Sequence, residues 1–425
     1  MNINSIKGTA YNRFFPALAH RDFRLLWISV IAADSSTLAL ITARAWLAKD
    51  MAESHGNTWV GITIFAGMIP FIIFPPFSGY LADRLVRKHL LASTFMLALV
   101  QSIILTVLAL SGAIQMWHLV ALSFINGIAR SVQSPTAFSL VANLVPKDLM
   151  LNAYALNTAT FHASRLLGPG LIAPLLAVIE PGWVFLFCNV PYFISLLLVF
   201  RIRNISSGII EPTRGVLFNL VAGFRYTYSH RALLMIVVLI ACHCALTMSF
   251  ESLMPVLSED RFNWGGSGVA YLMMAVGAGA MTASIYLAGV RGEQLRGRLL
   301  FISGVLSAIT PVGLAIAPNM AIGMIAASFM GATQTTYMVI TLTMMQAFVP
   351  DGIRGRISSI YIIHAGGIMS FANLGNGTLA DIVDPGWILL FGGIAFLGVA
   401  LISLLGPTMR RIYWNGLPAQ VETRV

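Results

Sequence analysis

Long apolar runs separated by short polar stretches repeat along the whole sequence. A helix needs about 20 mostly apolar residues to cross the hydrocarbon core of a membrane. Runs of this length occur twelve times, and each one predicts a transmembrane helix. They lie at 23–48, 57–82, 89–111, 116–144, 151–179, 183–203, 232–257, 266–289, 299–317, 319–347, 356–381 and 386–406. The pattern therefore predicts an all-α integral membrane protein with twelve transmembrane helices.

The predicted spans form two groups of six, which a longer polar stretch separates. This layout predicts an N-terminal half at 1–203, a cytoplasmic linker at 204–231 and a C-terminal half at 232–425. The halves share weak similarity: Val-Pro-Lys-Asp at 145–148 and Val-Pro-Asp-Gly at 349–352 precede corresponding spans, at an offset of 204 residues. Repeats of this kind predict two pseudo-symmetric halves with a binding site between them near mid-membrane.

The basic residues predict the orientation. With the N-terminus in the cytoplasm, 21 of the 26 Lys and Arg residues fall on the cytoplasmic side and three within spans. The two that remain outside are Lys49 and Arg261. Because short cytoplasmic loops carry an excess of Lys and Arg, we expect both termini in the cytoplasm and a multi-pass protein of the plasma or inner membrane.

The composition and the missing motifs argue against a soluble protein, a nucleic-acid-binding protein and an ATP-driven pump. Hydrophobic residues make up 57% of the chain and charged residues 10%, against roughly 25% charged residues in a soluble domain. The net charge of +10 lies in short loops, so it does not predict nucleic-acid binding. Cys188, Cys242 and Cys244 all lie in apolar runs and are expected to be packing residues, with no metal site. The sequence lacks a nucleotide-binding G-x-x-x-x-G-K-[ST] loop, which argues against an ATP-driven pump. No cofactor is expected.

Charges inside spans predict a central cavity. The spans at 89–111, 183–203, 299–317 and 386–406 have uncharged interiors, with Gln101 and Asn189 their most polar members, so we expect them to face lipid. Other spans carry Asp34, Arg44, Arg130, Arg165 and Glu251. An ionisable residue deep in a membrane is costly unless it faces a cavity or a partner. Helical spacing groups further polar residues with these charges. The candidate cavity residues are Asp34, Asn126, Arg130, Gln133, His162, Arg165, His243, Glu251, Gln334, Tyr337 and His364.

Several of these residues have a second interpretation. Arg44 lies late in its span and either extends to the outer surface or faces the interior. Asp34 either carries a proton, because burial favours a protonated carboxyl group, or forms a fixed ion pair with Arg130 or Arg165. Glu251 is either a proton carrier or an acid at the outer interface. The three histidines are either structural or proton-carrying.

The loop at 79–88 resembles the loop between helices 2 and 3 of the major facilitator superfamily, with its pattern G-x-x-x-D-[RK]-x-G-[RK]-[RK]. The matching residues are Gly79, Asp83, Arg84, Arg87 and Lys88, whereas Val86 replaces the second glycine. The resemblance implies a cytoplasmic gate. In this gate Asp83 would lie near the N-terminus of the span at 356–381, and Arg84 and Arg87 would connect neighbouring helix ends.

Segments 18–27, 145–170 and 349–356 resemble the branch that contains enterobactin exporters and macrolide-efflux proteins. Gly168 and Pro169 match the centre of a helix 5 motif of antiporters, which implies a kink there and export. Two glycines of that motif are replaced, by Ile172 and Ala173.

These observations favour a proton-coupled exporter of a small amphipathic compound, such as a drug or a siderophore, that works by alternating access. With three bases and two acids inside the spans, the preference for an anionic compound is weak. The expected partners are the small molecule, protons and the lipid bilayer, and the protein is expected to be a monomer. An importer or a lipid translocator of the same fold is the alternative. A membrane-bound receptor or enzyme is disfavoured, because no clustered nucleophile, metal or paired-acid site and no sizeable soluble domain is found.

Overall fold

The computed structural model describes residues 15–416, except 53, 75–84, 147–148, 204–215, 289, 291 and 350–353. This described part is helical, with no β-strand. Its helices are η1 (Pro16–Ala19), α2 (Arg21–Asp50), α3 (Gly56–Met68), α4 (Pro70–Ile73), α6 (Arg87–Leu110), α7 (Met116–Leu144), α8 (Met150–Leu176), α9 (Pro181–Phe200), α10 (Val216–Ser229), α11 (Arg231–His243), η3 (Cys244–Met248), η4 (Glu251–Leu253), α12 (Met254–Val256), η5 (Leu257–Arg261), α13 (Gly265–Ala288), α14 (Glu293–Ala315), α15 (Met320–Ala347), α16 (Arg354–Leu379), α17 (Pro385–Ser403) and α18 (Pro407–Asn415).

Helices cover the predicted apolar runs, and local chemistry explains several of their ends. Helices α9, α17 and α18 each begin with a proline, which suits the first helical position because no hydrogen bond is lost there. The Asn319 side chain accepts a hydrogen bond from the backbone of Ile322 and caps α15. Predicted and observed ends agree within six residues, apart from the run at 57–82, whose last part lies outside the described residues.

Eight helical segments of the described chain are long and apolar enough to cross a membrane. They are Arg21–Asp50, Gly56–Ile73, Arg87–Leu110, Pro181–Phe200, Arg231–Arg261, Gly265–Leu287, Glu293–Ala315 and Pro385–Ser403.

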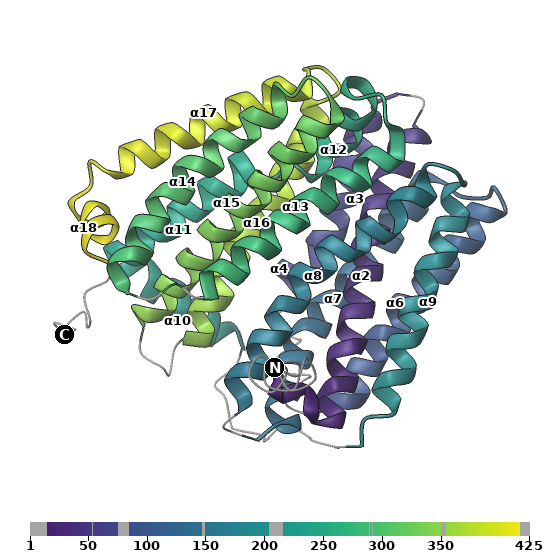
Figure 1. The fold of residues 1–425 in the computed structure, drawn as a ribbon, viewed down its shortest axis with the longest axis horizontal. Coiled ribbons are helices and arrows are strands. Elements are labelled where there is room, and N and C mark those ends of the chain that lie inside the picture. Colours follow the sequence, from purple (N-terminus) through teal and green to yellow (C-terminus); the bar gives the residue numbers. More distant parts are fainter. Residues whose placement is uncertain are drawn as a thin grey trace, which may run out of the picture.

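The helices form two groups that lie side by side (Figure 1). The first helix group, α2 to α9, encloses a core of buried apolar side chains drawn from 17–202, together with Ala270. The second helix group, α11 to α18, encloses two further cores drawn from 233–413 and 250–389. The start of α2 lies at the lower end of the first group in this view.

Helices α6, α9, α14 and α17 carry rows of exposed apolar side chains, among them Val107, Phe193, Ile302 and Phe391. Such a surface suits lipid. The most polar residues of α6 and α9 face inward instead. Gln101 is buried, and Asn189 donates a hydrogen bond to Thr106 Oγ1 at 3.0 Å.

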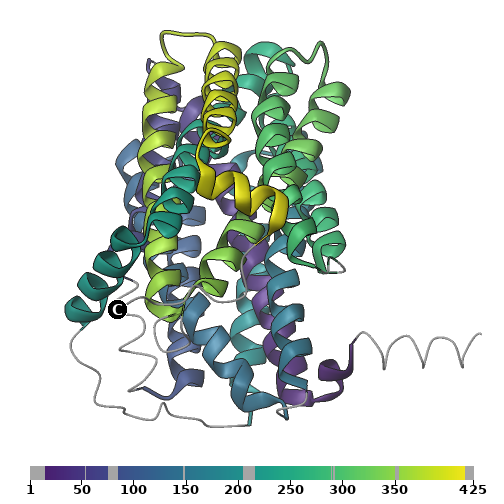
Figure 2. The same ribbon diagram turned by 90° about the vertical axis from the view of Figure 1, so that its left-hand side faces the viewer.

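The second part of the predicted linker is helical. Helix α10 continues almost directly into α11 and leans away from the bundle, and the short helix α18 lies across the second group (Figure 2). The Tyr228 hydroxyl of α10 lies 2.8 Å from Nε2 of His364 on α16. The helical part of the linker, α10, is thus attached to the second helix group.

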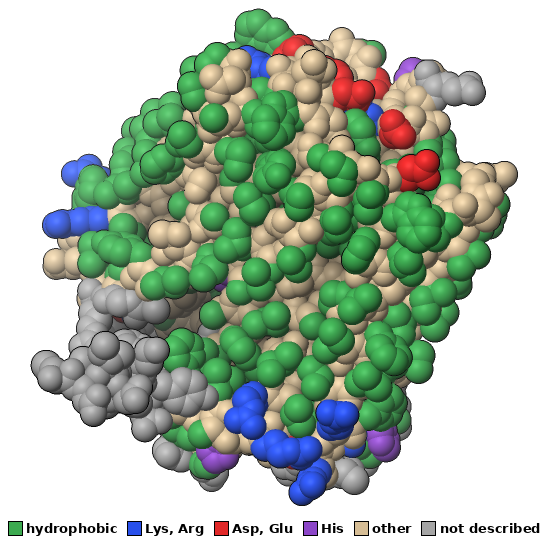
Figure 3. Space-filling model, turned by 45° about the vertical axis from the view of Figure 1, so that its right-hand side comes forward, with side chains coloured by type: hydrophobic (Ala, Val, Ile, Leu, Met, Phe, Trp, Pro, Cys, Tyr) green, Lys and Arg blue, Asp and Glu red, His purple; other side chains and the backbone are tan. Residues whose placement is uncertain are grey.

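On one face of the molecule, most basic and most acidic side chains lie at opposite ends. On the face shown in Figure 3, Lys and Arg gather at the lower end and Asp and Glu at the upper end. Apolar side chains cover most of the surface between them. This distribution fits a protein whose middle band lies in hydrocarbon.

Candidate transport site

A central cavity of about 370 Å³ lies between the two helix groups. Its walls come from α2, α3, α4, α7 and α8 on one side and from η3, η4, α13, α15 and α16 on the other. Most of the lining is apolar, including the methionines Met68, Met248, Met273, Met338 and Met369. Methionine side chains are flexible and polarizable, so such a wall can adapt to molecules of different shape.

An ion pair joins the two sides of the cavity. Arg165 Nη2 of α8 lies 3.2 Å from Glu251 Oε1 of η4, and both side chains are largely buried. The sequence predicted both Arg165 and Glu251 as cavity residues, but it offered Asp34 as the possible ion-pair partner of Arg165. The observed pair joins the two helix groups, so it depends on how the groups pack against each other.

Arg130 lines the cavity, and no hydrogen bond of its guanidinium is found among the described residues. Its guanidinium carbon lies 5.2 Å from the centre of the Phe71 ring, a distance at which a cation is attracted to an aromatic face. Within the described residues Arg130 forms no ion pair closer than 4.0 Å. The fixed ion pair of Asp34 with Arg130 or Arg165, one of the two interpretations of Asp34, is not formed within 4.0 Å among the described residues.

Asp34, a predicted cavity residue, is partly buried and does not belong to the described lining of the cavity. Its carboxylate accepts a hydrogen bond from Nε2 of Gln133 at 2.8 Å, which links α2 to α7. Gln133 is one helical turn from Arg130 on the same helix. A change in the charge of Asp34 would therefore act directly on the helix that carries Arg130.

The interpretation that Arg44 extends to the outer surface is wrong. Arg44 is buried in the first helix group, where its guanidinium donates to the Gln101 side chain and, at 3.5 Å, to the carbonyl of Leu122. Gln101 lies on a span that the sequence assigned to lipid. Sequence alone gave no sign of this pair, because a polar side chain on an apolar helix can face either way.

A buried tyrosine, Tyr192, is hydrogen-bonded to the cavity-lining residue Asn126. The hydroxyl of Tyr192 lies 2.7 Å from Thr37 Oγ1 and accepts a hydrogen bond from Asn126 Nδ2 at 3.3 Å. Asn126 and His162 both line the cavity. Tyr192 was missed because its span, 183–203, has no charged residue in its interior.

Besides Asp34 and Gln133, which are both outside the described lining, four predicted cavity residues make contacts elsewhere. His243 and Tyr337 stack inside the second group, with ring centres 4.4 Å apart. Gln334 donates to the carbonyl of Thr247 at 2.8 Å, and His364 contacts Tyr228 of α10. None of the four belongs to the described lining.

On α11 and its continuation the lining residues are Cys244, Met248 and Glu251. Their spacing of four and then three residues is that of one helix face. The predicted stripe ran through His243 and Thr247, each one position earlier than Cys244 and Met248. On α15 the lining residues Thr335 and Met338 each lie one position after the predicted ones, which corresponds to a rotation of about 100°.

Gly168 and Pro169 lie within the continuous helix α8. A Cβ atom on Gly168 would lie 2.4 Å from the carbonyl oxygen of Ser35, so glycine permits the close contact of α8 with α2. Pro169 lines the cavity.

The loop at 79–88 is described only from position 85. Gly79, Asp83 and Arg84 lie outside the described residues. Arg87 donates to Asn143 Oδ1 at 2.7 Å, and Lys88 donates to the carbonyls of Phe200 and Ile202 at 3.0 and 2.5 Å. These two bases thus connect the start of α6 to the ends of α7 and α9.

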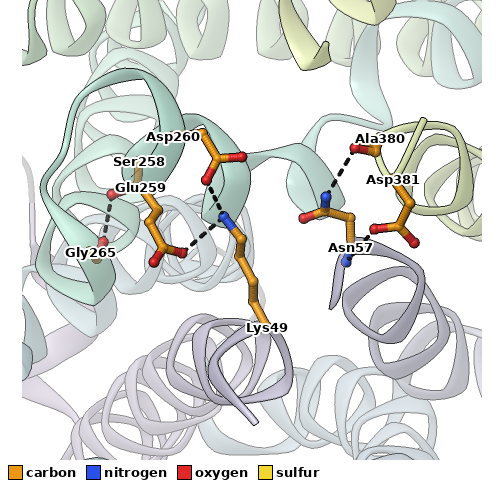
Figure 4. A network of polar contacts seen from close by, with 8 residues as sticks. All are labelled: Lys49, Asn57, Ser258, Glu259, Asp260, Gly265, Ala380 and Asp381. Atoms are coloured by element: carbon orange, nitrogen blue, oxygen red, sulfur yellow. Dashed lines mark hydrogen bonds and ion pairs between the residues drawn. The ribbon is translucent and has the colours of Figure 1, made fainter. Parts of the chain in front are cut away.

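A polar network joins the two helix groups near the end of α2 (Figure 4). Lys49 Nζ lies 2.9 Å from Glu259 Oε2 and 2.8 Å from Asp260 Oδ1. Beside it, Asp381 accepts hydrogen bonds from the backbone amides of Asn57 and Thr58, both at 3.0 Å. Asp381 thus caps the N-terminus of α3 from the other group, where the helix dipole favours an anion.

The sequence did not indicate this network, because its acids lie in short loops that look like ordinary solvent-exposed turns. No group of three or more His, Cys, Asp or Glu residues suited to a metal ion is found in the described part of the chain. The three cysteines are free, and Cys188 and Cys244 are buried.

Comparison with known proteins gives a consistent result. A family model described as "Transmembrane secretion effector" matches residues 13–411. The staphyloferrin A transporter of Staphylococcus aureus is 24% identical over 319 residues, which cover 73% of this chain and 78% of that protein. Macrolide efflux protein A of Enterococcus faecalis is 20% identical over 322 residues, covering 75% of this chain and 98% of the relative.

Among solved structures, a POT family transporter matches with a TM-score of 0.69 at 13% identity, covering 90% of this chain and 96% of that one. At this identity the likeness concerns the fold alone. Since the family model covers nearly the whole sequence, this chain belongs to the transmembrane secretion effector family of the major facilitator superfamily and is a multi-pass transporter of the cell membrane.

Proposed function

We propose that this protein exports a small amphipathic compound in exchange for protons, by alternating access. The observation that carries the proposal is the apolar cavity between the helix groups, which holds charged side chains at its wall. The name of one relative, macrolide efflux protein A, supports the direction. The names of both relatives, this one and the staphyloferrin A transporter, support the kind of compound. A drug or a siderophore is the compound class we propose for this chain.

In this proposal residues 1–203 and 232–425 are the two moving halves, the segment 204–231 connects them, and the chain works as a monomer. Twelve helices cross the membrane and both termini are cytoplasmic. The separation of bases and acids in Figure 3 supports this orientation. The Lys49 and Asp381 contacts then lie on the outer side, which supports a conformation closed toward the outside.

Asp34 is the proton-binding residue in the proposed cycle. Its hydrogen bond to Gln133 connects it with the helix that carries Arg130, so gain or loss of a proton would alter the contact between α2 and α7. Asp83 and Arg84 are proposed, with Arg87 and Lys88, to close the cytoplasmic side. Gly168 and Pro169 are the proposed point at which α8 bends.

Asp381→Asn is expected to favour opening toward the outside. Loss of a charged helix cap costs about 1 to 2 kcal/mol, which corresponds to a factor of about 5 to 30 in a two-state equilibrium. The measurement is the rate at which an impermeant maleimide, added outside, labels Met248→Cys in a background without native cysteines. We expect severalfold faster labelling.

Asp384→Asn is the matched control, because Asp384 caps its own helix α17 through the amide of Gly386 at 2.7 Å. Equal labelling rates in Asp381→Asn and Asp384→Asn would show that the Asp381 cap does not hold the outer side closed.

Transport in membrane vesicles of known orientation tests the proposed function. Inverted vesicles with an imposed pH gradient should accumulate a labelled macrolide or staphyloferrin A, and right-side-out vesicles should not. Uptake only by right-side-out vesicles would favour an importer. Movement of a labelled phospholipid between leaflets, without movement of either soluble compound, would favour a lipid translocator.

A further inference from the structure

A second cavity, of about 410 Å³, lies on the side of the second helix group. It is formed by the irregular continuation of α11, the end of α16 and the first half of α17. Its lining residues are Ala245, Leu246, Thr247, Ser249, Phe250, Leu253, Asn376, Leu379, Val383, Ile388, Leu389, Phe391, Gly392 and Ala395. We refer to this cavity as the lateral groove.

The wall of the lateral groove is apolar although the helix beside it is broken. The change from α11 to the π-helix η3 and then to the 3₁₀-helix η4 releases backbone carbonyls from regular helix bonding. Side chains from neighbouring helices meet two of them. Gln334 donates to Thr247 O at 2.8 Å, and Asn376 donates to Ser249 O at 2.6 Å. The groove can therefore hold an apolar ligand without leaving these carbonyls unpaired.

The lateral groove opens on the apolar outer surface. Leu379, Val383 and Phe391 line it and are 46%, 39% and 64% exposed. For a multi-pass membrane protein, side chains exposed at this level contact lipid chains. The molecules present at the opening are therefore phospholipids.

A cationic side chain lies at the outer end of the groove. Arg261 Nη1 would be 2.9 Å from a Cβ atom on Gly386, at the start of α17. Ile388 and Leu389 of the groove wall follow within one helical turn. Arg261 thus lies beside the first turn of α17, and the next residues of this helix form part of the groove wall.

Arg261 has donors to spare. Its Nε donates to the carbonyl of Ala317 at 3.3 Å, and within the described part of the chain it has no ion pair closer than 4.0 Å. The nearby carboxylate of Asp384 accepts a hydrogen bond from the amide of Gly386 and forms no ion pair with Arg261 within 4.0 Å. Lys49, the other basic residue on this side, is already paired with Glu259 and Asp260.

We propose that the lateral groove with Arg261 is a binding site for one phospholipid of the outer leaflet. The phosphate binds the guanidinium, whose planar donors suit a phosphate group, and one acyl chain fills the groove. The bound lipid supports the irregular segment of α11 that carries Glu251 into the central cavity. This site goes beyond the proposed transport function and does not depend on it.

The test measures phospholipid bound to the full-length purified protein by native mass spectrometry, after delipidation and incubation with phosphatidylglycerol. Arg261→Gln removes the headgroup contact, and Ala395→Trp fills the groove. We expect one tightly held lipid in the unmodified protein and at least about fivefold less in each variant, because a hydrogen bond to a charged group is lost or the chain is excluded. Arg201→Gln and Ala321→Trp are matched controls at exposed positions outside the groove and should retain the lipid.

Equal lipid retention in Arg261→Gln and the unmodified protein would overturn the proposal, as would retention in Ala395→Trp. Displacement of the lipid by soluble glycerophosphate at equal concentration would also overturn it, because the acyl chain would then contribute nothing. Thermal unfolding of each variant in detergent shows whether it is folded, so that a folding defect is not counted as loss of the site.

Discussion

Asp34→Asn is expected to reduce transport driven by a pH gradient by about tenfold or more, because the amide cannot take up and release a proton. Asparagine keeps the size of the side chain and can still accept a hydrogen bond from Gln133, which Asp34 accepts at 2.8 Å. The protein should therefore remain folded. The measurement is the initial rate of substrate accumulation in inverted vesicles, with and without an imposed pH gradient.

Asp50→Asn is the control, since Asp50 is an exposed carboxylate at the end of the same helix. Exchange of labelled for unlabelled substrate, which needs no net proton movement, should persist in Asp34→Asn. If Asp34→Asn kept full pH-gradient-dependent transport, Asp34 would not be the proton-binding residue. Normal rates in both assays would leave Glu251 as the candidate proton-binding residue.

Gly279→Ala is expected to cause the largest loss of stability among single methyl additions. The new Cβ atom would lie 1.7 Å from the carbonyl oxygen of Ser328, so α13 and α15 must move apart. Overpacking of this kind costs about 1 to 3 kcal/mol or more, and membrane helices depend on close contact through small residues. We expect a clear decrease in the thermal unfolding temperature in detergent.

Gly398→Ala serves as the matched control, because nothing lies within 4 Å of a Cβ atom at that position of α17. It should unfold at the temperature of the unmodified protein. An unchanged unfolding temperature for Gly279→Ala would mean that α13 and α15 do not pack as closely as the structure shows.

Helix positions could be predicted from the sequence because long apolar runs have few alternatives in a membrane. The spans at 116–144 and 319–347, for example, correspond to α7 (Met116–Leu144) and α15 (Met320–Ala347). Charges inside spans also indicated Arg130, Arg165 and Glu251, which all line the central cavity. A charged side chain at this depth needs a polar environment, and that requirement does not depend on the exact packing.

The sequence predicted less well how each helix is rotated about its axis, and therefore which of its side chains face the cavity. The predicted stripe on the span at 232–257 ran through His243, whereas Cys244 and Met248 line the cavity. Which face of a helix points to the cavity depends on contacts with other helices, such as the hydrogen bond from Gln334 to the carbonyl of Thr247.

The sequence by itself determined the membrane class, the helical segments and the set of charges that must avoid lipid, because these follow from the hydration cost of each residue and from the length of each run. Only the tertiary structure decided the partners of those charges. Arg165 pairs with Glu251, Arg44 donates to Gln101 and Asp381 caps α3. The physical reason is that each contact joins residues far apart in the chain, so its geometry exists only once the helices are packed.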